Sequence, residues 1–415
     1  MLQSKLFTKM EKTPPRDEES LNAKLLVQAG FVQKLMAGVY TFLPLGLRVL
    51  NKIENIVREE MNNAGAIEML MPGLQPKENW EATKRWDTFD ALLKTKSKFG
   101  GEYAMGPTHE EVVYPLLKKH LASYRDFPVA VYQIQTKFRD EKRAKSGLLR
   151  GREFRMKDCY SYHASDEERD KYYDVMKNSY MNIFKRLELN AVPTNAGGGT
   201  FSELSMEFQV LCAAGEDVIY LCENCNVAVN KELSGDLAAK CPKCKDLTNE
   251  KKSIEVGNIF PLKETFAKNF NLVFKDNTGK EKLVSAGCYG LGTSRVMGAI
   301  AEVKNDDFGL IWPKSVAPYD IHLVYLKSND RNVMAEAEKF YRKCLEADAG
   351  ILFDDRDDVS AGSKFAESDL IGIPLRVVIS DRTLEKESAE IKKRNEKNAG
   401  LVKLDDLDSY ISKDS

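Results

Sequence analysis

The chain has 415 residues, of which 43% are hydrophobic and 30% are charged. A chain of this length and composition folds into two or three domains with a sizeable core, which excludes a disordered polyelectrolyte. Because 62 basic residues face 63 acidic ones and leave a net charge of -1, any surface that binds nucleic acid must be local.

The sequence contains no run of about 18 consecutive apolar residues, and its N-terminal segment lacks the apolar stretch of a secretory signal. We therefore expect no membrane contact and a cytoplasmic location. In that reducing compartment the eight cysteines are not expected to form disulfides, so closely spaced pairs favour metal binding.

Residues 46–65 carry apolar side chains at steps of three and four, which predicts an amphipathic helix. A short apolar run from Ile67 to Met71 follows and is stopped by Pro72. This run is typical of a strand that is buried or paired on one side only.

The segment GPTHEE at 106–111 allows two interpretations. On an extended backbone the side chains of Thr108 and Glu110 would point to the same side. A helix start is the alternative, with Thr108 as its N-cap and Glu111 closing a capping box. Both arrangements can hold at once.

Residues 131–141 alternate with period two, which predicts a strand with one packing face and one polar face that includes Arg139 and Glu141. Residues 142–152 add five basic side chains, no acidic one and two glycines, and a second strand-like pattern covers 153–162. We expect an antiparallel hairpin with a cationic, mobile tip that receives a polyphosphate. A plain solvated hairpin is the alternative, although such hairpins usually mix both signs of charge at the tip.

After a predicted helix at 166–187 and a strand at 206–211, four cysteines form the pattern C-x2-C-x15-C-x2-C. These are Cys222, Cys225, Cys241 and Cys244. The spacing predicts a structural zinc site that closes a small ribbon, because four filled positions leave none open for catalysis. Four unrelated thiols are the alternative.

The segment GCYGLGTSR at 287–295 is weak evidence by itself. Its glycines fit either a strand-to-helix corner or a close approach of the backbone to a phosphate, with Arg295 neutralising the charge. No βαβ unit follows, so a dinucleotide-binding fingerprint does not fit. Alternating strand and helix patterns over 321–379 predict a small α/β domain at the C-terminal end.

Taken together, these segments resemble the prolyl-tRNA synthetases of the bacterial type, which are class II aminoacyl-tRNA synthetases. The segments that carry the resemblance are AGVYTFLPLG (37–46), REEMNNAGAIEMLMP (58–72), GPTHEE (106–111), YQIQTKFRDE (132–141), REFRMKDCYSYH (152–163), GCYGLGTSR (287–295), DDR (354–356) and LIGIP (370–374). The resemblance implies an α+β fold. Residues 1–316 would form a catalytic domain on an antiparallel sheet, with a zinc-ribbon-like insertion at 218–254, followed by an α/β anticodon-binding domain at 317–415.

The implied activity is that of a proline–tRNA ligase. L-proline would be activated by ATP to prolyl-adenylate and then transferred to the 3′ end of tRNA(Pro), with release of AMP and pyrophosphate. The resemblance further implies Mg²⁺ bound with ATP, a structural Zn²⁺, and a homodimer formed through the helix and strand that end at Pro72. A synthetase for threonine, glycine or serine is the nearest alternative. A non-catalytic RNA-binding relative is another, and the intact cationic set of the pocket argues against it.

The resemblance also assigns residues. Arg139 and Arg295 would be the catalytic cations. Proline would be held by Thr108, Glu110, Arg139 and Glu207. The residues expected to contact ATP are Arg139, Glu141, Arg150, Arg152, Phe154, Gln209 and Arg295. The cations expected to contact the anticodon are Arg356, Lys364 and Arg376.

Two features depart from the family pattern. Many bacterial-type members carry a large editing domain before the segment that matches 254–257, whereas only residues 212–253 intervene here. A proline pocket rejects the smaller alanine by only about 1–3 kcal/mol. We therefore expect alanyl-tRNA to be released and cleared by a separate hydrolase. In addition, Met206 stands where many relatives have His, which leaves the detail of the amino-acid pocket open.

Overall fold

The structure is a computed structural model that describes residues 1–233, 240–328 and 331–410. The chain forms two compact units. One, here called the nine-strand unit, comprises residues 36–40 and 53–299; the other, the five-strand unit, comprises residues 1–35, 41–52 and 300–415. In the described part of the chain, no helix is both long and apolar enough to cross a membrane.

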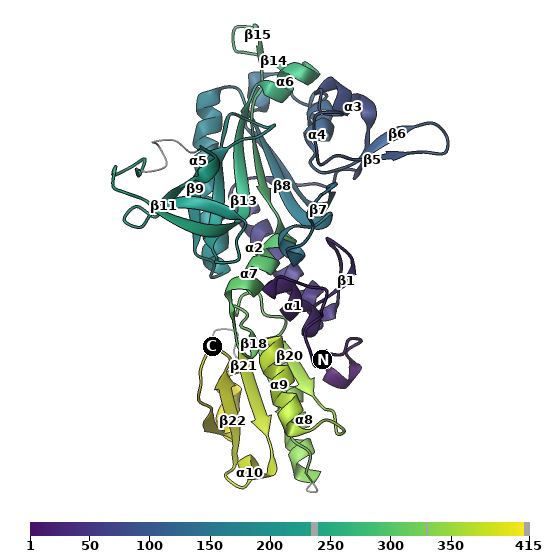
Figure 1. The fold of residues 1–415 in the computed structure, drawn as a ribbon, viewed down its shortest axis with the longest axis vertical. Helices are drawn as coiled ribbons and strands as arrows, with labels where there is room; N and C mark the ends of the chain where they lie inside the picture. Colours follow the sequence, from purple (N-terminus) through teal and green to yellow (C-terminus); the bar gives the residue numbers. More distant parts are fainter. Residues whose placement is uncertain (234–239, 329–330, 411–415) are drawn as a thin grey trace. The chain divides into compact units, whose positions relative to one another are not determined.

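The nine-strand unit is built on one sheet with the strand order β10-β9-β12-β11-β13-β16-β8-β7-β3 (Figure 1). Neighbouring strands are antiparallel except for the parallel pairs β3–β7 and β9–β12. The strand bounds are β3 (Ile67–Glu68), β7 (Val129–Phe138), β8 (Glu153–His163), β9 (Ala191–Gly197), β10 (Leu204–Leu211), β11 (Asp217–Cys222), β12 (Val227–Asn230), β13 (Asn249–Lys263) and β16 (Ser285–Leu291).

The predicted hairpin is formed by β7 and β8, which pair from Val129↔Tyr162 to Phe138↔Glu153. The polar face of β7 is itself buried, since Gln133 and Lys137 are both 0% exposed. The period-two pattern therefore marks a strand between an apolar layer and a buried polar network. Helix α5 (Asp166–Arg186) contacts β8, β13 and β16 and begins where Ser165 Oγ accepts a hydrogen bond from the Glu168 N–H at 3.2 Å.

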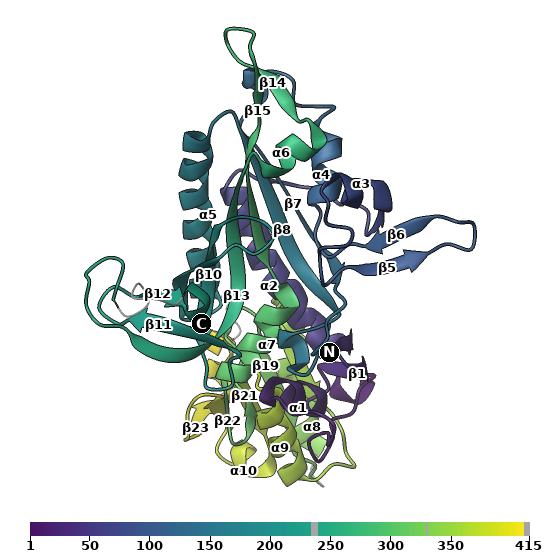
Figure 2. The same ribbon diagram turned by 45° about the horizontal axis from the view of Figure 1, so that its top comes forward.

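The segment between β3 and β7 forms a small layer of its own. Strands β4 (Leu74–Pro76), β6 (Glu102–Met105) and β5 (Leu93–Lys96) form a three-stranded sheet beside helices α3 (Lys77–Ala82) and α4 (Glu110–Leu117). The β5–β6 hairpin projects away from the large sheet in both views (Figure 2). Helix α6 (Thr265–Phe270) and the ribbon of β14 (Val273–Lys275) and β15 (Glu281–Leu283) follow β13.

Helix α2 (Pro44–Asn63) is the amphipathic helix predicted at 46–65, and it buries Val49, Ile53, Val57 and Met61. The strand predicted after it is shorter than expected, because β3 covers Ile67–Glu68 and does not reach Met71. The Met71 N–H instead bonds to the Gln133 side chain at 3.0 Å. The parallel pairing of β3 with β7 therefore ends before Met71, because the Gln133 side chain takes the place of a backbone acceptor.

The five-strand unit contains the strand order β20-β19-β21-β22-β23. Its elements are β19 (Ile321–Tyr325), α8 (Arg331–Glu346), β20 (Ile351–Asp354), α9 (Ala361–Ile371), β21 (Leu375–Ile379), α10 (Asp381–Leu384), β22 (Ser388–Lys393) and β23 (Gly400–Lys403). The first three strands are parallel and were predicted together with their helices, whereas the antiparallel β22 and β23 were not. Strands β22 (SAEIKK) and β23 (GLVK) carry few apolar residues compared with β19 (IHLVY) and β21 (LRVVI).

The start of the chain packs against this C-terminal sheet. The Met1 amino group donates to the Ile351 carbonyl at 2.9 Å, Leu2 forms a parallel bridge with Phe353, and the Gln3 side chain bonds to His322 at 2.8 Å. Helix α1 (Leu21–Gln28) belongs to the same unit. The domain boundaries expected from the sequence, 1–316, 218–254 and 317–415, assign the start of the chain and the C-terminal sheet to different domains. These boundaries stay predictions.

We predict that Glu54 on α2 stabilises the nine-strand unit. Its carboxylate, 5% exposed, accepts hydrogen bonds from Arg155 at 2.9 and 3.0 Å and from Thr293 at 3.0 Å. Glu54→Gln removes the charge that these donors share, so the free energy of unfolding should fall by about 1–3 kcal/mol in guanidinium denaturation. The control is Glu59→Gln, whose surface pair with Arg186 should matter by less than about 1 kcal/mol. Equal losses in both variants would contradict the prediction.

Candidate active site

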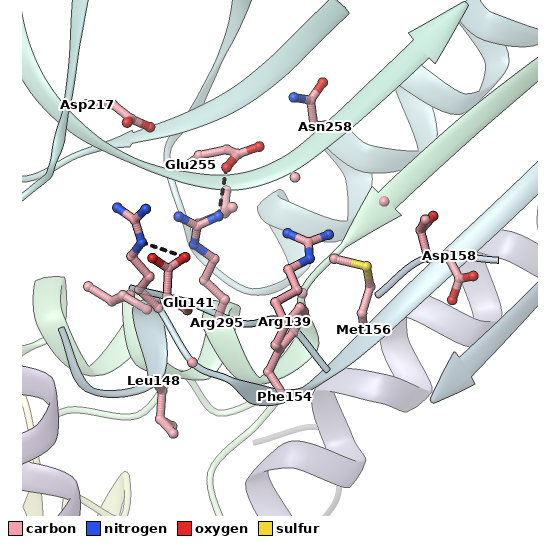
Figure 3. A pocket seen from close by; sticks show the side chains of 18 of the residues that line it. Arg139, Glu141, Leu148, Phe154, Met156, Asp158, Asp217, Glu255, Asn258 and Arg295 are labelled. Atoms are coloured by element: carbon pink, nitrogen blue, oxygen red, sulfur yellow. Dashed lines mark hydrogen bonds and ion pairs between the residues drawn. The ribbon is translucent and has the colours of Figure 1, made fainter. Parts of the chain in front are cut away.

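A cavity of about 390 Å³ opens in the nine-strand unit between the β7–β8 hairpin and strands β13 and β16. Its wall includes Arg139, Phe154, Glu255 and Arg295, together with glycines of β16 and of the turn before helix α7 (Thr293–Val303). Figure 3 shows the charged side chains that converge there. The hairpin and the glycine segment are therefore two walls of one site.

Arg139 and Arg295 both line this cavity. The Arg139 guanidinium lies 5.2 Å from the centre of the Phe154 ring, and Arg295 donates to Glu255 at 2.7 Å. In Figure 3 both guanidinium groups point toward the β13 wall, where Glu255 and Asn258 lie. Burial lowers the pKa of Arg139, and the neighbouring charge of Arg295 acts in the same direction. Two like charges held together in this way form a site for an anion.

Glu141 lies at the open end of the hairpin and pairs with Arg150 at 3.0 Å. Burial acts against the ionised form of Glu141, but hydrogen bonds from Arg150 and from the Arg143 N–H outweigh it and lower its pKa. Arg150 also pairs with Glu216 at 2.9 Å, and the side chains of Glu141, Arg150 and Glu216 all line the cavity. Arg152 points elsewhere, because its guanidinium donates to the carbonyls of Glu141 and Ala37.

The tip of the hairpin is not a purely cationic loop. Residues Gly147–Leu149 form a short 3-10 helix in which Leu148 and Leu149 are buried, 6% and 8% exposed, and both line the cavity. A Cβ at Gly298 of α7 would come within 3.0 Å of the Leu148 side chain, which is closer than side chains normally approach. The two leucines thus anchor the middle of a loop whose ends carry the charges.

The glycine segment 287–295 forms the predicted strand-to-helix corner, and the expected approach to a phosphate stays a prediction. In this corner β16 ends at Leu291 and α7 begins at Thr293, and Gly290 and Gly292 line the cavity beside Arg295. No side chain stands between the backbone and the cavity at these two glycines. The corner therefore lets a ligand approach the main chain closely.

Thr108 and Glu110 do meet, with a hydrogen bond of 2.5 Å between their side chains, but not on an extended backbone, because His109 between them has a ψ of 20° and Glu110 begins helix α4. Helix α4 does begin here, but its N-cap is His109, with no side-chain cap, so the Thr108 capping box is wrong. Glu111 turns instead to Thr83 at 2.8 Å and Arg85 at 3.0 Å. Thr108 lines the cavity, and Glu110 lies directly behind it with 0% exposure.

Arg85 balances the two buried glutamates. Its guanidinium is 3.0 Å from Glu111 and 3.6 Å from Glu110, and it lies within 4.7–5.3 Å of the ring centres of Trp80, Phe89, Phe201 and Phe266. Burial raises the pKa of Glu111 to about 7, an effect that Arg85 opposes and Glu110 reinforces. One cation between two carboxylates leaves a net negative charge next to Thr108. Nothing in the local sequence around Arg85 indicated this role.

A buried network of polar groups supports Thr108 from below. The Lys137 ammonium pairs with Asp158 at 2.7 Å and bonds to His109 Nδ1 at 2.6 Å. The Tyr160 hydroxyl donates to Asp158 at 2.8 Å and accepts the His109 N–H at 2.9 Å. Burial, assisted by Lys137, lowers the pKa of His109 to about 4, so the imidazole is neutral. Sequence reasoning missed this network, although the polar face of β7 was its signal.

Glu207 and Gln209 on β10 do not line the cavity themselves. Gln209 donates to Glu207 at 2.8 Å and to Asp217 at 2.9 Å, and Asn258 reaches Glu207 at 3.5 Å. Asp217 and Asn258 do line the cavity, so Glu207 lies one side chain behind its wall. Burial raises the pKa of Glu207 to about 7, with the charge of Glu255 acting in the same direction.

The four cysteines of the spaced motif lie together, with their sulfur atoms all within 4.8 Å of one another. A tetrahedral zinc ion with four thiolates requires sulfur–sulfur distances of about 3.8 Å, and the Cys222–Cys244 distance is 3.6 Å. In both C-x2-C pairs the residue after the second cysteine is left-handed, with φ of 48° at Asn226 and 66° at Lys245. The same backbone turn thus directs the sulfur atoms of each cysteine pair toward one common position. The donor set and the geometry fit a metal ion.

The three cations expected to contact the anticodon take part in internal pairs. Arg356 bonds to Asp354 and Glu367 at 2.7 and 2.6 Å, and Arg376 bonds to Asp369 at 3.1 Å. Lys364 is 1% exposed and donates to the Tyr325 carbonyl at 2.6 Å. Lys364 therefore has no surface on which to meet RNA in this conformation, and its expected role stays a prediction without structural support.

Two family models match the sequence. The tRNA synthetase class II core domain (G, H, P, S and T) matches residues 93–304, and the anticodon binding domain matches residues 320–414. Curated proline–tRNA ligases match nearly the whole chain. Those of Zymomonas mobilis and Rickettsia bellii are each 37% identical, over 99% of this chain and 98% and 99% of their own length.

The chain belongs to the proline–tRNA ligase family. Family members differ in length: the alignment with the Persephonella marina protein, 30% identical and fully covered, spans 564 positions against the 415 residues of this chain. This chain is one of the short members and lacks a large insertion. The predicted fold class, a class II core followed by an anticodon-binding domain, is confirmed.

Solved structures agree on the fold. The prolyl-tRNA synthetase from Cryptosporidium parvum complexed with halofuginone and AMPPNP superposes with a TM-score of 0.79 over 94% of this chain and 75% of its own, at 18% identity. The same enzyme complexed with L-proline and AMP gives a TM-score of 0.77.

We predict that the Lys137–Asp158 pair is needed for stability. Lys137→Met leaves the Asp158 charge, 2% exposed, without its cation, so the free energy of unfolding should fall by about 3–5 kcal/mol in guanidinium denaturation. Adding Asp158→Asn should recover part of the loss. Lys171→Met, which breaks a surface pair with Glu167, is the control and should cost less than about 1 kcal/mol. A Lys137→Met variant as stable as that control would contradict the prediction.

Proposed function

We propose that this protein is a proline–tRNA ligase, which forms prolyl-adenylate from L-proline and ATP and transfers the prolyl group to tRNA(Pro). The observation that carries the proposal is the pair Arg139 and Arg295 on one cavity, beside the Phe154 ring, in a chain 37% identical to curated proline–tRNA ligases. A polyphosphate needs two separated cations, and an adenine base needs a flat apolar surface.

The first step joins a proline carboxylate oxygen to the α-phosphorus of ATP. It breaks the bond between that phosphorus and the oxygen that bridges to the β-phosphate, and pyrophosphate leaves. Arg139 would neutralise the α-phosphate and the carboxylate, and Arg295 the γ-phosphate. In the second step the terminal ribose hydroxyl of the tRNA attacks the prolyl carbonyl carbon, AMP leaves, and the hydroxyl proton is released. Both steps depend on positioning and on charge neutralisation, so no side-chain nucleophile is required.

Mg²⁺ would enter with the triphosphate and offset its charge. The carboxylates of Glu141 and Glu255 line the cavity, and carboxylate oxygens are the ligands that Mg²⁺ prefers. In the structure these two groups pair with Arg150 and Arg295. A bound triphosphate would therefore compete for the same arginines and release the carboxylates toward the cation.

Proline is distinguished by its secondary ammonium and its compact ring. Glu110 would receive the ammonium through its buried carboxylate, which lies behind Thr108 and next to the cavity wall. Thr108 fixes one oxygen of this carboxylate. Glu207 adds a second negative group near the wall of the cavity. The role of each of these residues is part of the proposal.

Three further features complete the proposal. The cysteine cluster would hold Zn²⁺ as a structural ion. A homodimer would form at strand β3, the edge of the nine-stranded sheet, where Ile67 is 66% and Leu70 is 76% exposed. The expected cytoplasmic location follows from the use of tRNA as a substrate.

The proposal predicts pyrophosphate exchange that depends on L-proline and not on threonine, glycine or serine. Arg295→Ala should lower kcat/KM for ATP at least about 100-fold, because it removes a charge that stabilises the transferring phosphate. Arg186→Gln, on the surface of α5, is the control and should leave exchange unchanged. Exchange driven by another amino acid would identify a sister synthetase, and no exchange with any amino acid would identify a non-catalytic relative.

We also predict that the enzyme releases alanyl-tRNA. Alanine fits a proline pocket with a loss of only about 1–3 kcal/mol, and the chain lacks a large insertion in which an editing site could lie. Charging of tRNA(Pro) with labelled alanine should therefore yield a product that persists with the purified protein and disappears on addition of a separate deacylating hydrolase. Clearance by the purified protein alone would contradict the prediction.

A further inference from the structure

The cysteine ribbon, here the strands β11 and β12 with the four metal-ligating cysteines, leads directly to the cavity. Strand β11 begins at Asp217, which lines the cavity, and ends at the ligand Cys222. Strand β12 returns from Val227, paired with Cys222, to Asn230, paired with Ile219. It also adds to the large sheet by parallel pairing with β9, where Ala228 faces Thr194.

The far end of β12 reaches the wall of the pocket indirectly, through Glu207, which lies behind that wall. Asn230 Nδ2 donates to Glu207 Oε2 at 2.9 Å, and the amide is oriented because its Oδ1 accepts the Glu232 N–H at 3.1 Å. Glu232 in turn accepts the Gly197 N–H at 2.6 Å. Of the two amide groups that hold Glu207 Oε2, one therefore belongs to β10 itself and the other to the ribbon.

Little apolar packing holds this ribbon in place. The cluster beneath it contains four buried residues, Val192, Ile219, Leu221 and Ala228. The strands of the ribbon are held in the nine-stranded sheet, because β11 pairs with β13 and β12 pairs with β9, but the end that carries the cysteines packs on this small core. A metal commonly stabilises a segment with so small a core. Four thiolates within 4.8 Å would also repel each other without a cation between them. Pairing with β11 and β9 sets the register of β12, and an ion bound by the four cysteines would fix the turn that joins β11 to β12 and so steady Asn230 at the other end of β12.

We propose that Asn230 is a positioning residue of the amino-acid pocket, held by the metal-bound ribbon, so that loss of the ion weakens the binding of the amino acid. This inference rests on the proposed function, because it takes Glu207 as part of the site for proline. Its physical basis is that amide donors favour the ionised form of a buried carboxylate. The carboxylates of Glu255 and Asp217 act against that form from β13 and β11.

The test compares Asn230→Ala with Asn249→Ala, which removes an amide at the start of β13 that contacts Glu223 and not the pocket. Pyrophosphate exchange with proline is measured first on the wild-type protein, and its absence would count against the proposed function alone. In Asn230→Ala the KM for proline should rise about tenfold or more, as for a lost hydrogen bond to a charged group, while the KM for ATP and the zinc content stay unchanged.

The pH profile separates positioning from a general structural role. Without the Asn230 amide the pKa of Glu207 rises, so the acid limb of kcat/KM for proline should move to higher pH and activity should recover in alkaline buffer. A merely loosened fold would lower kcat/KM at every pH. An unchanged KM in Asn230→Ala, or a uniform loss over the whole pH range, would overturn the inference.

The role of the ion is tested with Cys225→Ser/Cys244→Ser. Elemental analysis should find about one zinc per wild-type chain and none in this variant. Hydrogen exchange over residues 204–211 should become faster, and the KM for proline should rise as in Asn230→Ala. Adding Asn230→Ala should cause no further rise, because both changes remove the same contact. Additive effects, a metal-free wild-type protein, or a metal-free variant with normal KM would overturn this part.

Discussion

The guanidinium groups of Arg139 and Arg295 line the same cavity although their like charges repel each other. Other side chains of the nine-strand unit hold them there. Arg139 lies at the end of the β7–β8 hairpin, over the Phe154 ring, and Arg295 lies at the start of α7, paired with Glu255. Glu255 and Glu141 provide the opposite charge while no substrate is bound. In the proposed function, a triphosphate would replace carboxylates that already compensate these cations.

The walls of the cavity are held by buried ionic groups rather than by apolar packing alone. Lys137 and Asp158 lie under Thr108, and Arg85 lies between Glu110 and Glu111. Such pairs contribute little net stability compared with apolar residues of the same volume, but removing one partner is costly. We interpret them as groups that fix geometry, because they hold the Thr108 hydroxyl and the Glu110 carboxylate, the proposed site for proline, in one position.

The metal site proposed for the cysteine ribbon would extend this principle. Strand β12 of the ribbon lies between β9 and β11 in the large sheet, and its last residue, Asn230, bonds to Glu207. An ion held by the four cysteines would add to the small apolar core beneath the ribbon, which contains four buried residues.

The sequence by itself determined the β7–β8 hairpin, the amphipathic α2, the strand and helix alternation of the C-terminal sheet, and the four-cysteine cluster. In each case the information is local: a period of two or of 3.6, or a fixed spacing between ligands. The tertiary structure alone decided that Arg85 balances two glutamates, that Asn230 reaches Glu207, and that Lys364 is buried. These contacts join residues far apart in the chain, and no local pattern encodes which distant charge a side chain will meet.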